Sequence, residues 1–177
     1  MTRRVFPRVR GILLVAAVLL PLLAGCGYHV VQPGSKGTEL AGKTFEVKLF
    51  ANKSFRAGIE AAVTDALVDE LVTREGQRVL EVGGEYVVSG TVISYGRSTV
   101  SYTATDEAKE YRASIATEAV LTRRITGQIV WKGNVSAYQD FPANTNAALQ
   151  QNNEAAAIRS ASLKIAQQIY LHLTENF

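Results

Sequence analysis

The sequence predicts an α+β domain, a two-layer sandwich in which about four mainly antiparallel strands carry two helices on one face, in the order strand, helix, three strands, helix. Two stretches with apolar residues at every third or fourth position indicate the helices. Between them lie segments rich in β-branched and aromatic residues, separated by glycine-containing turns, which is typical of antiparallel sheet.

The first strand is predicted at 44–51, because Phe45, Val47 and Leu49 alternate with charged residues at the period of two of a half-buried strand. A turn at 52–54 precedes the first helix. Apolar residues at four-residue intervals predict this helix, and Gly76 is expected to end it in a left-handed cap. The apolar positions are Ile59, Val63, Leu67 and Leu71.

The middle of the chain is predicted to be sheet. A lead-in at 78–82 reaches a long strand at 86–102, in which Gly90 or Gly96 is expected to mark a bulge. The next strand, at 111–121, alternates clearly, with Tyr111, Ala113, Ile115, Ala119 and Leu121 on one face. A turn at 126–127 leads to the last strand, at 129–138. One face of this sheet is expected to meet the core.

The second helix is expected to begin with Asn152 or Asn153 as its N-cap and to run nearly to the end of the chain. Its apolar stripe consists of Ile158, Ile165, Ile169 and Leu173. With both helices on one face, the other face of the sheet stays free.

Residues 1–25 are predicted to be a lipoprotein signal peptide that is removed. Four arginines precede an apolar run that, at about 14 residues, is shorter than the roughly 20 needed to cross a hydrocarbon core. The run ends in Leu23-Ala24-Gly25-Cys26, which resembles the lipobox of bacterial lipoproteins. We therefore expect acylation of Cys26, a lipidated N-terminus and tether at 26–43, and a single domain at 44–177.

Charge and cysteine content fit an exported, anchored domain. Four of the 19 Lys and Arg residues leave with the signal, so 15 basic residues face 16 acidic ones, and nucleic-acid binding is not indicated. Cys26 is the only cysteine, and lipidation would account for it.

No residue pattern indicates catalysis or a metal centre. Residues 37–44 match the phosphate-binding pattern G-x-x-x-x-G-K-[ST], but a strand pattern rather than a helix follows, so we interpret them as a turn. His29 and His172 do not have metal-ligand spacing, and the acidic residues are expected singly on solvent faces or in turns. We expect no enzyme and no cofactor apart from covalent diacylglycerol and an N-acyl chain on Cys26.

Short motifs along most of the mature chain occur in an order and at a spacing that are typical, when taken together, of one protein family. They are Cys26-Gly27-Tyr28-His29, Phe50-Ala51-Asn52-Lys53-Ser54-Phe55-Arg56 with Gly58 and Glu60, Thr64-Asp65-Ala66-Leu67, Ser89-Gly90-Thr91-Val92, Ser94-Tyr95, Ser101-Tyr102, Glu110-Tyr111-Arg112, Trp131 and Asn153-Glu154-Ala155-Ala156. In these motifs the chain resembles the LptE family of lipopolysaccharide-assembly lipoproteins.

The resemblance implies a non-enzymatic partner of the outer-membrane β-barrel LptD. Such a protein lies as a plug within or beneath the barrel lumen, on a lipid anchor and facing the periplasm, and helps to pass lipopolysaccharide to the cell surface. Residue 27 is glycine rather than the aspartate that favours inner-membrane retention in enteric lipoproteins, so outer-membrane sorting is expected by analogy.

Candidate contact residues follow from the chemistry of these partners. Lipopolysaccharide carries phosphates, for which Lys and Arg are the fitting side chains, and Arg97, Lys109 and Arg112 flank one predicted hairpin. Ordinary solvated strand charges are the alternative for these three. The candidate barrel contacts are Tyr95, Tyr102, Trp131 and Tyr138, although aromatic residues on strands are more often core packing.

A second functional class remains open at this stage. A membrane-anchored periplasmic binding or adaptor module, for peptidoglycan or envelope proteins, could share the same exported α+β sandwich. Capture of partners from solubilised membranes discriminates the two classes.

Overall fold

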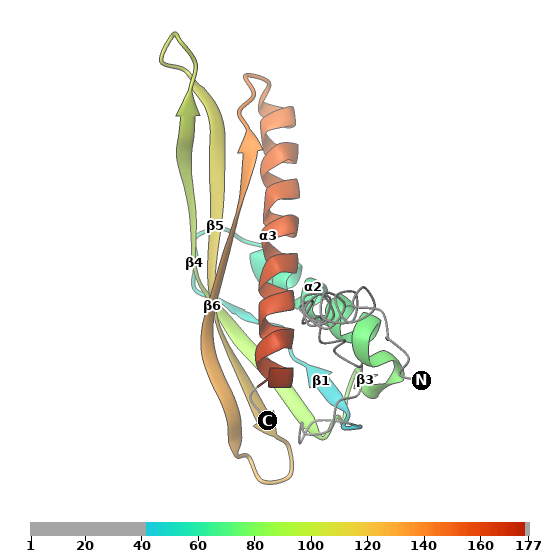
Figure 1. Cartoon of the computed structure of the whole chain (residues 1–177). Helices are drawn as coiled ribbons and strands as arrows, with labels where there is room; N and C mark the ends of the chain where they lie inside the picture. Colours follow the sequence, from blue (N-terminus) through green and yellow to red (C-terminus); the bar gives the residue numbers. More distant parts are fainter. Residues whose placement is uncertain (1–41, 176–177) are drawn as a thin grey trace, which may run out of the picture. The chain divides into compact units, whose positions relative to one another are not determined.

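The computed structural model describes residues 42–175, so the expectations for the signal peptide, for Cys26 and for the tether as far as residue 41 lie outside the described residues. The elements are β1 (Phe45–Val47), β2 (Ala51–Asn52), α2 (Ile59–Glu75), the short 3-10 helix η2 (Gly76–Arg78), β3 (Val79–Leu80), β4 (Tyr86–Tyr102), β5 (Ala108–Arg123), β6 (Ile129–Pro142) and α3 (Ala147–Glu175) (Figure 1). The predicted α+β class and the order of helices and strands are confirmed.

The sheet is mixed and contains six strands rather than about four. Its order is β3-β1-β4-β5-β6, and β2 pairs with β4 further along that strand. The three long strands β4, β5 and β6 form an antiparallel meander, whereas β1 and β2 run parallel to β4, and β3 runs parallel to β1. The parallel pairs arise because α2 carries the chain back over the sheet between β1 and β3.

Both helices lie on one face of the sheet, as predicted. In Figure 1, α3 runs along the three long strands while α2 crosses it near β1 and β3. The predicted apolar stripes of the two helices are buried, and they pack with inward side chains of the strands in one core. Among residues 42–175, no helix lies on the opposite face of the sheet.

The segment predicted as one strand at 44–51 forms the two short strands β1 and β2. The prediction that Leu49 faces the core is wrong. Residues 48–50 interrupt the pairing, which resets the alternation, so Phe50 is 1% exposed and Leu49 is 68% exposed. The backbone N–H of Phe50 donates to Thr64 Oγ1 of α2, at 3.1 Å, and turns the Phe50 ring toward the core.

The bulges of β4 do not lie at its glycines. The register with β5 shifts between Val92 and Ser94 and again after Thr99, so Ile93 is an extra residue without a partner on β5. The prediction of a bulge at Gly90 or Gly96 is wrong. Gly90 has a different role. A Cβ atom there would lie 2.3 Å from the Phe50 ring, so the packing around this position leaves room only for glycine.

The ends of the helices are set by different signals. Helix α2 stops before Gly76, whose φ is +60°, as the predicted glycine stop requires, although its ψ of −130° is not that of a left-handed helical cap. Helix α3 begins earlier than predicted, because Asn146 rather than Asn152 or Asn153 is the cap. Its Oδ1 accepts from the N–H groups of Ala148, at 3.0 Å, and Leu149, at 3.2 Å.

Candidate functional site

The helix-free face of the sheet, here called the outer face, carries a shallow groove across β4, β5 and β6. In the strand register, Ala116 lies between Ser94 and Ser136, and Ser114 lies between Gly96 and Tyr138. The groove has a volume of about 410 Å³, and its outward-facing positions are Ser94, Gly96, Ser114, Ala116, Ser136 and Tyr138. Because nearly all of these side chains are small, a partner can approach the strands closely, and the serine hydroxyls are available as hydrogen-bond groups.

Arg112 and Asp140 face each other across β5 and β6 beside this groove. The guanidinium donates two parallel hydrogen bonds to the carboxylate, at 2.7 and 2.8 Å, and stacks over the Tyr138 ring at 4.0 Å from its centre. The hydrogen bonds from Arg112 hold the pKa of Asp140 below its ordinary value. The same bonds raise the pKa of Arg112, so both groups are charged at neutral pH. The outer face therefore offers a fixed, half-exposed guanidinium whose charge is balanced by one carboxylate.

Arg97 lies on the opposite, helix-covered side of the sheet. It pairs in register with the buried Ala113, whereas Arg112 pairs with Ser98. Its guanidinium donates to Glu154 of α3 at 3.1 Å. The three basic residues predicted to bind lipopolysaccharide are therefore not brought together on one face: Arg97 and Arg112 point to opposite sides, and Lys109 is exposed near the start of β5.

Glu154 is the centre of a buried polar cluster that the sequence pattern did not reveal. Glu154 is 8% exposed, and its carboxylate accepts a 2.7 Å hydrogen bond from the Tyr95 hydroxyl and lies 3.8 Å from Arg56. Burial of the Tyr95 ring and its hydrogen bond to Glu154 raise the pKa of Tyr95 well above its ordinary value. The expectation that acidic residues stand on solvent faces is wrong here, because two arginines and a phenol replace the water that a buried carboxylate would otherwise need.

The four aromatic residues predicted to contact a barrel have different surroundings. Tyr95 is 5% exposed and belongs to the core, while Tyr102 and Tyr138 are 62% and 52% exposed. Trp131 is half-buried on β6 and stacks on His172 of α3, with ring centres 5.5 Å apart. Of the four, Tyr102 and Tyr138 thus present the most ring surface to a partner.

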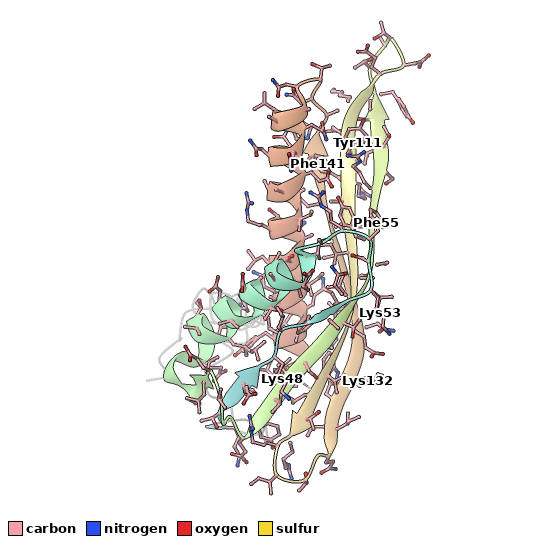
Figure 2. The ribbon with its side chains drawn as sticks, turned by 180° about the vertical axis from the view of Figure 1, so that it is seen from behind. Lys48, Lys53, Phe55, Tyr111, Lys132 and Phe141 are labelled. Carbon is pink, nitrogen blue, oxygen red and sulfur yellow. The ribbon has the colours of Figure 1, made fainter. Side chains whose placement is uncertain are left out.

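Phe55 is an exposed aromatic residue that stands out in the sequence only as part of a motif. It is 82% exposed and lies 5.7 Å from the Tyr95 ring, on the connector between β2 and α2 (Figure 2). Asn52 makes this connector rigid: its Nδ2 donates to Arg56 O at 2.9 Å and to Glu60 Oε2 at 2.6 Å, and its Oδ1 accepts from Ser54 N at 2.8 Å. An Asx-type turn just before a helix, with an aromatic residue inside it, is the signal that could have marked this site.

The described residues contain no group of three or more metal-ligating side chains. Lys43 and Thr44 precede β1 rather than a helix, so the prediction that a strand follows residues 37–44 is confirmed. Within residues 42–175, no helix has the length and apolar character needed to span a membrane.

Comparisons with solved structures show the same fold at low sequence identity. A candidate lipoprotein of Caulobacter crescentus CB15 has a TM-score of 0.52 and 15% identity, covering 70% of this chain and 86% of that chain. A minor lipoprotein of Acinetobacter baumannii has a TM-score of 0.51 and 17% identity, with 77% and 96% covered. The hypothetical protein CT253 of Chlamydia trachomatis has a TM-score of 0.51 and 8% identity, with 74% and 95% covered.

A search of curated protein sequences found no significant match. The family profile described as "LptE: Lipopolysaccharide-assembly" matches residues 42–173, which is nearly all of the described domain and well over half of the chain. The sequence motifs, the mixed sheet with two helices on one face and this match agree, and the chain belongs to the LptE family of lipopolysaccharide-assembly proteins.

Proposed function

We propose that the protein is a non-enzymatic outer-membrane lipoprotein, anchored through an acylated Cys26, that docks as a plug in an LptD-like β-barrel and assists lipopolysaccharide transport to the cell surface. The observation that carries this proposal is the family match over residues 42–173, because it spans both helices and all six strands rather than one shared motif.

The outer face supports a plug role physically. The interior of an outer-membrane barrel is polar, so a plug needs polar surface that can exchange its water for hydrogen bonds with the barrel wall. Here the outer face offers serine hydroxyls in the groove and the paired charges of Arg112 and Asp140. The helices and the core behind it keep this face rigid.

Lipopolysaccharide contact is assigned to Arg112 and Lys109 rather than to Arg97. Arg112 can donate its hydrogen bonds to a phosphate in place of Asp140, because this ion pair is half-exposed. Arg97 instead pairs with the buried carboxylate of Glu154, which would lose a hydrogen-bond donor if Arg97 turned to a phosphate. The double variant Lys109→Gln, Arg112→Gln should weaken lipopolysaccharide binding at least tenfold, since the loss of a single charge-assisted contact of about 1.5 kcal/mol already corresponds to about that factor.

The control is the double variant Lys132→Gln, Arg159→Gln. It also removes two positive charges, but from β6 and α3 rather than from the β4–β5 hairpin. Binding of fluorescent lipopolysaccharide to the detergent-solubilised full chain measures both. Equal affinities for the two variants would remove Lys109 and Arg112 from the contact.

Affinity purification from detergent-solubilised membranes tests the plug itself. The tagged full chain should retain a large β-barrel protein, and Ser136→Arg, which fills the groove, should reduce its recovery. Ser160→Arg on the exposed side of α3 is the matched control and should leave recovery unchanged. Recovery of a cell-wall or soluble envelope partner without a barrel would instead support the anchored adaptor.

A further inference from the structure

Strand β6 forms one edge of the described sheet, because β5 is its only neighbour in the strand order. It is 14 residues long, and α3 runs beside it (Figure 1). Its register with β5 is continuous from Trp131 to Pro142. In an antiparallel pair, alternate residues direct their backbone N–H and C=O groups toward the partner strand, and the residues between them direct these groups away from it. Every second residue of β6 therefore presents its backbone at the edge.

Side chains cap the second half of this edge. Lys164 Nζ of α3 donates to Tyr138 O at 3.0 Å. Asn153 Nδ2 of the same helix donates to Pro142 O at 3.2 Å. Between them, a glutamine of β6 itself donates to Asp140 O at 2.9 Å. These contacts identify residues 138, 140 and 142 as edge-facing, and their carbonyl groups already have hydrogen-bond donors.

The first half of the edge is not capped in this way. Every second residue before Tyr138 presents its backbone in the same direction, because no register shift intervenes. These residues are Lys132, Asn134 and Ser136, which we call the open edge. Among residues 42–175, no side chain forms a hydrogen bond with the backbone of these three residues. The open edge thus offers N–H and C=O groups at the spacing that a further strand requires.

The other described borders of the sheet are protected against strand addition. Strands β2 and β3 are each only two residues long. Beyond its pairing with β2, β4 is interrupted by the bulge at Ile93 and by register shifts after Thr99. Short strands, bulges and lysine side chains are the usual protection of an edge. Lys132 does not serve this purpose, because its Nζ pairs with Glu118 of β5 at 2.9 Å.

Helix α3 places apolar side chains beside the open edge. Its Lys164 contacts β6 at Tyr138. Its His172 stacks on Trp131, with ring centres 5.5 Å apart, so the helical segment between these two contacts runs along the open edge. Leu171, seven residues after Lys164 and so on the same side of the helix, is 47% exposed. An added strand would rest one set of its alternate side chains on Leu171 and Trp131.

The open edge is continuous with the groove of the outer face. Ser136 belongs to both, since its side chain lines the groove and its backbone faces the edge. Lys132 and Asn134 lie two and four residues before it on the same strand, so their side chains point to the same face. A partner that covers the outer face therefore also meets the backbone of the open edge.

We infer that the open edge binds an extended segment of the barrel partner, which joins β6 as an additional strand. Backbone hydrogen bonds give such a contact its affinity, and the side chains that rest on α3 give it specificity. The segment therefore carries apolar residues at alternate positions. The inference rests on the proposed function for the source of the segment. It adds to the side-chain contacts of the outer face a contact that recognises backbone.

Hydrogen exchange of the full lipidated chain, alone and in the purified complex with the barrel, tests the added strand. Fragmentation of the exchanged peptides in the mass spectrometer resolves single amides. The amides of Lys132, Asn134 and Ser136 should exchange about tenfold more slowly in the complex, because each must then break a hydrogen bond before it exchanges. Unchanged exchange at these amides in a complex that contains the barrel would overturn the inference and leave the proposed function standing. Absence of a barrel from the preparation would overturn both.

Two variants at Asn134 separate the role of the backbone from that of the side chain. Asn134→Pro removes the edge-facing N–H, and proline is tolerated in an edge strand where the N–H is not paired. Asn134→Ala keeps the N–H and is the matched control. Recovery of the barrel in affinity purification should fall about fivefold for Asn134→Pro and stay at the wild-type level for Asn134→Ala.

Circular dichroism establishes that each variant is folded before recovery is compared. Equal recovery for the two folded variants would overturn the inference. If Asn134→Pro does not fold, the exchange measurement decides, because it uses the unaltered chain.

Discussion

The carboxylate of Glu154 lies where three segments meet: the connector after β2, the middle of β4 and the first half of α3. Tyr95 and Arg97 reach it from β4 and Arg56 from the connector. A buried carboxylate is costly unless it is paired, so these partners are required for the three segments to pack.

Replacing Tyr95 by phenylalanine should make stability less sensitive to alkaline pH. The folded state raises the pKa of Tyr95, because the ring is buried and its hydroxyl donates to Glu154, and so holds the proton more tightly than the unfolded state does. This stabilisation is fully present below the ordinary tyrosine pKa of about 10 and is lost as the pH rises through the higher folded value.

Tyr95→Phe should cost about 2 kcal/mol at pH 8, the value of a hydrogen bond to a charged group, and should flatten the fall in stability between pH 9.5 and 11. Urea unfolding of the detergent-solubilised chain across this range measures both effects. Tyr102→Phe, at an exposed position, is the control and should keep the wild-type profile. Parallel pH profiles for Tyr95→Phe and the wild type would refute the role given to this phenol.

Gly90 should tolerate no side chain. A Cβ atom there would lie 2.3 Å from Phe50 Cε2 and 2.6 Å from the backbone oxygen of Glu118, so both a core ring and the neighbouring strand would have to move. Gly90→Ala should destabilise the domain by about 1–3 kcal/mol. Gly96→Ala, on the same strand with nothing within 4 Å of its Cβ, should change stability by less than about 0.5 kcal/mol. Chemical denaturation midpoints compare the two.

At the scale of elements, the start of α3 is set by a capping residue that is visible in the sequence. Asn146 caps the helix through Ala148 and Leu149, although Asn152 and Asn153 also looked like cap residues. The stretch from 147 to 151 carries no large inward residue until Gln150, so its apolar periodicity is weak and the helix was predicted to start too late. A cap can be read from sequence only where the periodic pattern begins beside it.

The position of the cap makes a prediction for α3. Asn146→Ala should cost about 1 kcal/mol, because two N–H groups of the first turn lose their acceptor. Asn152→Ala, inside the helix and exposed, should be neutral or slightly stabilising, since alanine favours helix. Thermal unfolding followed by circular dichroism measures both, and a larger loss for Asn152→Ala would move the cap back to that residue.

The faces of β4 and β5 show why part of the candidate site could be predicted and part could not. On β5 the alternation is unbroken, so the core side of Ala113, Ile115 and Leu121 was predicted and is confirmed. On β4 the bulge at Ile93 reverses the alternation of inward and outward side chains in the residues that follow, so Tyr95 and Arg97 face inward. A bulge of this kind depends on pairing with the next strand and leaves no mark in the residues of its own strand.

At the scale of the whole molecule, the mixed sheet was beyond sequence reasoning for a similar reason. The helices and the long meander follow from local periodicity, which is why the α+β class was predicted. The parallel pairing of β1 with β4 joins Phe45 to Tyr86, and the pair of β1 with β3 joins Phe45 to Val79. Such distant pairs are selected by packing under α2, not by the pattern of either strand.

Hydrogen exchange should divide β4 into two halves. Residues 86–88 pair with β5 and β1, and residues 91–92 pair with β5 and β2, whereas residues 97–102 pair only with β5. Backbone amides of the first half should therefore exchange more slowly on average, because opening them disrupts two ladders and the core. Mass spectrometry of overlapping peptides measures this, and faster exchange at 86–92 would contradict the sheet order.

The parallel position of β1 also governs the order in which the parts of the domain can fold. β1 comes first among the described strands, yet the partners of Phe45 in its neighbours β3 and β4, Val79 and Tyr86, lie 34 and 41 residues downstream. The β4–β5–β6 meander, by contrast, can close through nearest-neighbour hairpins. Phe45 and Phe50 therefore lack their packing partners until β4 has formed, so the β1–β2 segment is expected to join the core late.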